Sequence, residues 1–189
     1  MERAKKESLP KSVIEASIAR GQGKSVSGAP LESMTFEAML PHAVGAVIEC
    51  QTDMKLKTLH DIRVLVKDAG GVQRATGFLF ERKGKIVLEH KEGMSMDDIL
   101  DHAIDAGATD VDEDEAGRIV LQTEPNELSG VAQKVQSLAD VKIESLELTL
   151  FPKEDQMIKL DDESKAQIDS IVEQLMEEPY VQDVYTNAT

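Results

Sequence analysis

The side chains with the clearest binding chemistry in this sequence are Lys and Arg residues in its first half. Arg63 and Lys67 are four residues apart in a predicted helix and share one face, whereas Ile62 and Val66 point the other way. A row of cationic groups on an exposed helix can bind phosphates. The candidate contacts with nucleic acid or a ribosome are therefore Lys5, Lys6, Lys11, Arg20, Lys24, Lys55, Lys57, Arg63, Lys67, Arg74, Arg82 and Lys83.

An ordinary solvated surface explains these residues equally well, because Asp61, Asp68 and Glu81 stand close enough in sequence to pair with them. The net charge of the chain is −15, and it is unevenly distributed. Residues 1–24 carry six Lys and Arg against three acids, residues 25–93 carry nine of each, and residues 94–189 carry six against 24. The second half therefore repels nucleic acid, and it either keeps the protein soluble or docks a basic protein partner.

One short motif is similar to a phosphate-binding loop but is incomplete. Gly23-Lys24-Ser25 is the usual ending of such a loop, yet Ile18 stands where the loop needs its first glycine. The motif also needs a strand before it and a helix after it, and here the predicted order is the reverse. We therefore predict no nucleotide cofactor.

Motifs for metal binding and catalysis are also incomplete. Asp110, Asp112 and Asp114 alternate as in a calcium loop, but Glu115 occupies the glycine position, so we expect a solvated acidic turn. The four histidines are far apart, and neither a Gly-x-Ser-x-Gly elbow nor a cysteine with a dedicated base is visible. The sequence therefore predicts no metal site and no enzyme.

Composition indicates a globular protein without disulfides. With 189 residues, of which 41% are hydrophobic, the chain can bury one fair core or two small ones. No apolar run is long enough to cross a membrane, so no membrane partner is expected. Cys50 is the single cysteine and lies in an apolar run, which predicts a buried, unreactive thiol. The absence of Trp and an aromatic content of 3% disfavour base stacking on single-stranded nucleic acid.

Hydrophobic periodicity predicts alternating strands and helices from about residue 33 onward. Strands are expected near residues 35–39, 46–50, 77–80, 85–90, 119–122, 142–151 and 181–185. Helices are expected over 58–69, from Ser95 to Gly107, over 126–139, and from Asp161 to Pro179. Sheets with helices packed on one face fit this order, so we predict the α+β class with two small α/β-sandwich, ferredoxin-like domains.

Several segments stand in the order found in one known family. They are LPKSVIEASIARGQGK (9–24), VIECQTD (47–53), AGGV (69–72), FLFERKG (78–84), AIDAGATDV (103–111) and EEPYVQDVYTNA (177–188). The sequence thereby resembles the YebC/PmpR family, which includes the mitochondrial translational activator of cytochrome c oxidase subunit I. The resemblance implies three domains. The first is a basic N-terminal helical domain, and the other two are α+β domains, of which the third domain is inserted into the second. The expected bounds are 1–30 for a remnant of the helical domain with its linker, 31–84 plus 161–189 for the middle domain, and 85–160 for the inserted domain.

Two departures from the family pattern shape the functional expectations. The chain begins only eight residues before the segment Leu9-Pro10-Lys11, so most of the helical domain is expected to be missing. The glycine-rich turn of the family is replaced by FEAMLPHA (36–43), which suggests a divergent, organellar branch.

The resemblance implies a non-enzymatic regulator of gene expression. The leading expectation is a mitochondrial translational activator in the matrix that acts on the ribosome or on messenger RNA. One alternative is a DNA-binding transcriptional regulator of the YebC/PmpR type, which would be cytoplasmic in a bacterium. A second alternative is an acidic interaction module that docks a basic ribosomal protein. The sequence does not define the oligomeric state.

Overall fold

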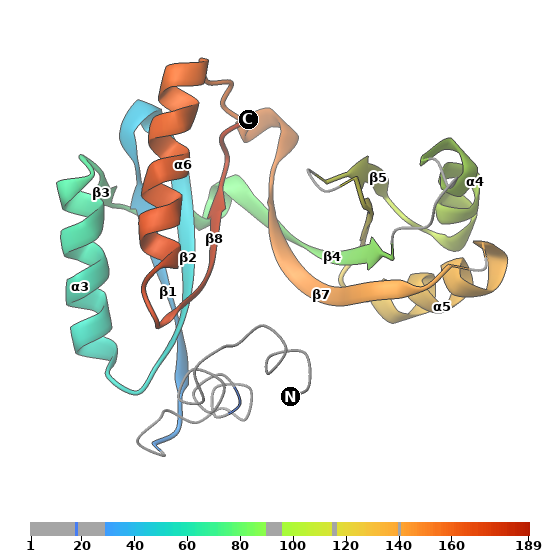
Figure 1. Ribbon diagram of the computed structural model, residues 1–189, viewed down its shortest axis with the longest axis horizontal. Helices are drawn as coiled ribbons and strands as arrows, with labels where there is room; N and C mark the ends of the chain where they lie inside the picture. Colours follow the sequence, from blue (N-terminus) through green and yellow to red (C-terminus); the bar gives the residue numbers. More distant parts are fainter. Residues whose placement is uncertain (1–17, 19–28, 90–95, 115–116, 140) are drawn as a thin grey trace, which may run out of the picture. The chain divides into compact units, whose positions relative to one another are not determined.

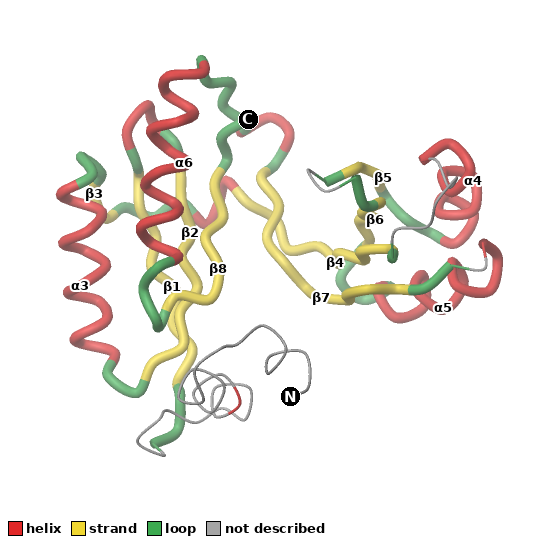
Figure 2. Tube along the Cα trace, viewed as in Figure 1, coloured by secondary structure: helices red, strands yellow, loops and turns green. Residues whose placement is uncertain are grey.

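The computed structural model describes Ile18 and residues 29–89, 96–114, 117–139 and 141–189. The remnant and linker expected over 1–30 therefore lie almost entirely outside the described residues. The chain divides into two compact units, Met1–Leu79 with Pro152–Thr189 (unit 1) and Phe80–Phe151 (unit 2). Each unit has a four-stranded sheet with helices packed on one face (Figure 1, Figure 2), which confirms the predicted α+β class.

Unit 1 orders its strands β3-β1-β2-β8, and every neighbouring pair is antiparallel. Helices α3 and α6 lie side by side on one face of this sheet (Figure 1). The elements are β1 (Glu32–Met39), β2 (Gly45–Thr52), α3 (Lys55–Asp68), β3 (Val72–Gln73), α6 (Asp162–Met176) and β8 (Val181–Thr186), with short 3-10 turns at Pro41–Ala43, Gly77–Leu79 and Glu154–Gln156.

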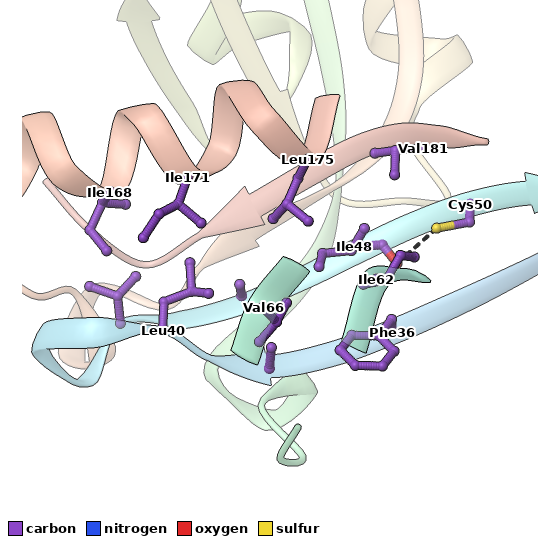
Figure 3. Close-up of a cluster of buried hydrophobic side chains, with 13 residues drawn as sticks. Phe36, Leu40, Ile48, Cys50, Ile62, Val66, Ile168, Ile171, Leu175 and Val181 are labelled. Carbon is purple, nitrogen blue, oxygen red and sulfur yellow. Dashed lines mark hydrogen bonds between the residues drawn. The ribbon is translucent and has the colours of Figure 1, made fainter. Parts of the chain in front are cut away.

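The core of unit 1 forms where alternate strand residues meet the inner faces of both helices (Figure 3). Phe36 and Ile48 of the sheet are 1% and 0% exposed, and they face Ile62 of α3 and Leu175 of α6. Full burial of one such side chain stabilises the fold by roughly 1.5–3 kcal/mol. Packing of this kind, more than helix propensity, holds α3 against the sheet.

Helix α3 begins three residues before the predicted start, because two buried threonines hold its first turn. The Thr52 hydroxyl accepts hydrogen bonds from the Met54 N–H (3.0 Å) and from the Thr58 hydroxyl (2.8 Å). The prediction of a helix over 58–69 is therefore correct in type but short at the N-terminal end. The longer helix includes Lys55 and Lys57, which the predicted bounds left outside it.

Helix α6 begins where the sequence predicts, with Asp161 as its N-cap. The Asp161 carboxylate accepts a hydrogen bond from the Ser164 N–H (2.8 Å), and this bond is the main reason that the pKa of the carboxyl lies below its usual value. An ionised N-cap also complements the positive end of the helix dipole.

Unit 2 follows the order strand, helix, strand, strand, helix, strand, with the sheet arranged β5-β6-β4-β7. This is the split β-α-β topology of ferredoxin-like domains. Its core includes Ile86, Leu121 and Val135, each 0% exposed. The elements are β4 (Phe80–Leu88), α4 (Met96–Ala106), β5 (Asp110–Glu113), β6 (Ile119–Thr123), α5 (Leu128–Ala139) and β7 (Ile143–Pro152).

The predicted strands at 77–80 and 85–90 are wrong as separate elements. Residues 77–79 form a 3-10 turn, and a single strand, β4, then runs through Gly84. A Cβ at Gly84 would overlap the Thr123 hydroxyl and would lie 2.7 Å from a Leu128 methyl group. The glycine therefore permits close packing inside a strand, although in sequence it looks like a break.

The acidic turn predicted at Asp110–Asp114 is also only partly correct. Residues 110–113 form the edge strand β5, which pairs with β6, and the turn follows it. Val111 packs against the core, whereas its neighbours Asp110 and Asp112 are exposed. The alternation of acidic and apolar residues is therefore that of a strand with one solvent-exposed face. Acidic side chains on an edge strand also discourage pairing with other chains.

Candidate nucleic-acid interface

The outer face of α3 is where the structure brings predicted basic residues together. Arg63 and Lys67 are exposed, whereas Ile62 and Val66, about 100° around the helix from them, are 0% and 1% exposed. Lys57 lies on the same exposed half of the helix. Lys57, Arg63 and Lys67 are called the α3 basic face below.

The basic side chains of α3 differ in how they are held. The Arg63 Nε donates a hydrogen bond to the Gln73 Oε1 (3.0 Å), which orients the guanidinium beside β3. Lys55 instead forms an ion pair with Glu32 of β1, with 2.6 Å between Nζ and Oε2. Among the described residues, no carboxylate pairs with either lysine of the α3 basic face. Lys55 is therefore the α3 cation whose charge is most offset.

Arg74 lies just beyond β3, in an acidic setting. Its N–H donates to the Glu37 carbonyl (3.2 Å), and its side chain lines an open hollow with Glu37 and Gln73. The Glu37 carboxylate accepts hydrogen bonds from the N–H groups of Thr76 (2.6 Å) and Gly77 (2.7 Å). This fixed carboxylate beside Arg74 weakens the attraction of the site for phosphate.

Arg82 and Lys83 lie on β4, and therefore in unit 2. The Lys83 ammonium pairs with Glu81 (2.7 Å) and donates to Gln122 (3.4 Å). The remaining predicted contacts lie outside the described residues: Lys5, Lys6, Lys11, Arg20 and Lys24.

Two exposed apolar side chains accompany the α3 basic face, and sequence reasoning assigned them no role. Leu56 is 85% exposed and Val64 is 41% exposed. With His60 they occupy positions i, i+4 and i+8, which form one stripe. The signal was present in the sequence, because this stripe is out of phase with the core stripe through Ile62.

Helix α6, beside α3, has the opposite charge. It carries four acidic residues against one lysine, whereas α3 carries four basic residues against two acids. A polyanion is therefore attracted to the outer face of α3 and repelled by α6.

Other candidate chemistry is not assembled in the described part of the chain. Cys50 is 2% exposed, which confirms the predicted burial, and burial raises the pKa of its thiol to about 11. His42, His60 and His102 are exposed, and His90 lies outside the described residues. Among the described residues, no three His, Cys, Asp or Glu side chains converge as metal ligands. No described helix has the length and apolar character needed to cross a membrane.

Two compact α+β units, the second placed between two segments of the first in the chain, define the fold class of this protein. Residues 31–188 match the family described as "TACO1/YebC second and third domain", and the chain belongs to the TACO1/YebC family.

Relatives and a solved structure extend this match. The chain is 36% identical to a probable transcriptional regulatory protein of Bifidobacterium animalis subsp. lactis, covering 99% of this chain and 74% of that protein. It is 36% identical to a protein of the same description in Thermobifida fusca, covering 100% and 75%. The crystal structure of a conserved hypothetical protein from Aquifex aeolicus is similar, with a TM-score of 0.77, 31% identity and coverage of 100% and 76%.

These findings confirm the resemblance to YebC at the level of the family. The relatives' description as probable transcriptional regulatory proteins agrees with the expectation of a regulator. The relatives named above are bacterial, so they do not support the expected mitochondrial branch. They favour the transcriptional alternative over translational activation.

Proposed function

We propose that this protein is a DNA-binding regulator of gene expression that contacts duplex phosphates through the α3 basic face. The observation that carries the proposal is the gathering of Lys57, Arg63 and Lys67 on one exposed helix face of a chain whose net charge is −15. The names of the bacterial relatives support DNA as the ligand and a bacterial cytoplasm as the location.

The charge of this face favours contact with the phosphate backbone of DNA. Each phosphate that a Lys or Arg neutralises releases counterions and steepens the dependence of affinity on salt by about 0.9 logarithmic units. Three contacts from unit 1 therefore account for a slope of roughly 2.7 units. Such contacts hold the protein on DNA without reading base sequence, so selection of a site requires further contacts.

The first prediction concerns the charge of the α3 basic face. In the variant Lys57→Glu/Arg63→Glu/Lys67→Glu, we expect affinity for a fluorescent 20-base-pair duplex in low salt to fall at least tenfold, because three attractive contacts become repulsive. Fluorescence anisotropy at several salt concentrations should also give a salt slope smaller by two to three units.

The control is Lys142→Glu/Lys159→Glu/Lys165→Glu, which changes the net charge equally at exposed lysines outside α3. It should retain most of the affinity. Equal losses in both variants would show that only net charge matters and would remove the proposed face. Binding to ribosomes or RNA but not to duplex DNA would instead support the translational alternative.

A further inference from the structure

Helix α4 of unit 2 has an apolar face in the core and an exposed apolar stripe beside it. The core face contains Ile99 and Ala103, which are 2% and 0% exposed. The stripe, about 100° around the helix from them, carries Met96, Leu100 and Ile104, which are 38%, 36% and 57% exposed. These three residues occupy positions i, i+4 and i+8, so they form one continuous stripe about 12 Å long. We call them the α4 stripe.

The surroundings of the α4 stripe are acidic. Residues 96–114 contain eight Asp and Glu and no Lys or Arg. Asp101 and Asp105 are exposed on the helix, and Asp110 and Asp112 are exposed on the edge strand that follows. Among the described residues, no Lys or Arg forms an ion pair with any of these four aspartates.

The basic residues elsewhere in unit 2 are mostly engaged by other acids. Four of them form ion pairs within the unit: Lys83 with Glu81, Lys85 with Glu147, Arg118 with Asp114 and Glu144, and Lys142 with Glu89. Lys134 of α5 lies nearer to α4, because its ammonium donates to the Ala106 carbonyl at the C-terminal end of that helix (3.3 Å) and lines the same hollow as Asp105. This one cation offsets only part of the acidic charge of residues 96–114, so the field around the α4 stripe stays negative and attracts a cationic partner.

We infer that the α4 stripe is a docking surface for a Lys/Arg-rich amphipathic helix of a partner protein. The apolar side of such a helix would cover Leu100 and Ile104, as when an amphipathic helix lays its apolar face on a hydrophobic surface. Its cationic flanks would lie against Asp101 and Asp105. The same carboxylates repel nucleic acid and anionic lipid, so charge complementarity selects a basic protein segment.

This surface is separate from the α3 basic face in both residues and charge. A partner on α4 and a duplex on α3 would be recognised by different units of the chain. Loss of one activity by substitution therefore need not affect the other, and the two proposals can fail independently.

The test uses the full chain and a fluorescent 18-residue synthetic helix with a leucine stripe and lysine flanks. We expect saturable binding by anisotropy, weakened about tenfold by Leu100→Ser/Ile104→Ser because these residues form the centre of the contact. Asp101→Asn/Asp105→Asn should weaken binding several-fold and reduce its salt dependence. Thermal unfolding establishes that each variant is folded, and duplex binding should be unchanged.

The matched control is Asp162→Asn/Glu163→Gln on α6, which removes the same charge from unit 1. If it weakens peptide binding as much as the α4 charge variant does, attraction is unspecific and the proposal fails. Tight binding of a peptide with glutamate flanks would also overturn it. Concentration-dependent self-association that Leu100→Ser/Ile104→Ser abolishes would assign the stripe to a second copy, and it would likewise overturn the proposal.

Discussion

Single side chains on α3 differ in how much positive charge they offer a partner. The ammonium of Lys55 is offset by Glu32, an exposed ion pair worth at most about 1 kcal/mol to stability. The lysines of the α3 basic face have no such carboxylate among the described residues. Lys55 therefore contributes less to phosphate binding than its place in the sequence suggests. For this reason it is not one of the residues of the α3 basic face.

Cys50 shows how burial changes the chemistry of one residue. Its side chain is 2% exposed and packs in the core of unit 1 (Figure 3). Loss of solvation is the main cause of a thiol pKa of about 11, and the neighbouring Glu49 adds to it. The thiolate is the reactive form, so the folded protein keeps this cysteine inert near neutral pH.

The second prediction therefore concerns thiol reactivity and alkaline stability. Ellman's reagent at pH 8 should react slowly with the folded chain and rapidly in denaturant. Because the pKa is raised on folding, the stabilising contribution is complete below the unfolded pKa and is lost as pH rises from about 9 to 11. Urea unfolding at a series of pH values measures this decline.

The Cys50→Ala variant should lose this part of the alkaline decline. Tyr180, whose phenol pKa is also raised mainly by burial, should continue to destabilise the variant at still higher pH. Rapid labelling of the folded wild-type chain at pH 8 would contradict the burial argument.

At the scale of elements, the β1–β2 hairpin is unusual in its turn. His42 and Ala43 have φ angles of 60° and 62°, in the left-handed region that favours glycine. The sequence has no glycine at either position, in contrast to the glycine-rich turn of the family it resembles. Contacts with α6 support the turn, because the His42 ring lies 2.9 Å from Gln167 Oε1 and 3.5 Å from the Ser164 hydroxyl.

The third prediction is that Ala43→Gly stabilises unit 1 by about 0.5–1 kcal/mol. Left-handed backbone costs a residue with a Cβ about 1–2 kcal/mol, and the greater entropy of unfolded glycine offsets part of that gain. Urea unfolding measures the change. The control Ala166→Gly, at an exposed position in α6, should destabilise by a similar amount. Destabilisation by Ala43→Gly would show that the turn does not have the backbone described.

At the scale of the whole molecule, unit 2 interrupts the chain of unit 1. The two ends of the interruption meet inside unit 1, because the Lys153 N–H donates to the Leu79 carbonyl (2.9 Å). The late segment of unit 1 is also fastened to the early one. Asn187 is 1% exposed, and its amide oxygen accepts a hydrogen bond from the Gly45 N–H (2.8 Å).

The fourth prediction is that the two units fold separately. A chain in which two glycines replace Phe80–Phe151 should keep unit 1 folded, because the closing ends are already hydrogen-bonded neighbours. Isolated residues 80–151 should also unfold cooperatively, because their core is their own. Circular dichroism and urea unfolding measure both.

Asn187→Ala provides a contrast to this deletion. It should destabilise unit 1 by about 1–3 kcal/mol, because it leaves buried polar groups unpaired. Failure of the shortened chain to unfold cooperatively would show that the units depend on each other for stability.

Sequence patterns predicted the bounds and buried faces of helices correctly where the residues that define them are close in sequence. Asp161 and Ser164 define the start of α6 within one turn, and the period of Ile62 and Val66 identifies the inner face of α3. Patterns failed at Gly84, because Thr123 of β6 and Leu128 of α5, which pack against it, are distant in sequence. The start of α3 was missed although its partner is near in sequence, because the Thr52 side chain that holds the first turn belongs to β2 and does not cap the helix from the N-cap position.

The sequence by itself determined the family, the α+β class and the positions of most elements, because hydrophobic periods and capping residues act over a few neighbours. Only the tertiary structure decided which charges remain available. Lys55 is offset by Glu32 of β1, which is distant in sequence, whereas Lys57 and Lys67 extend from α3. It also decided that Leu100 and Ile104 stay exposed, because exposure depends on which face of a helix the sheet covers.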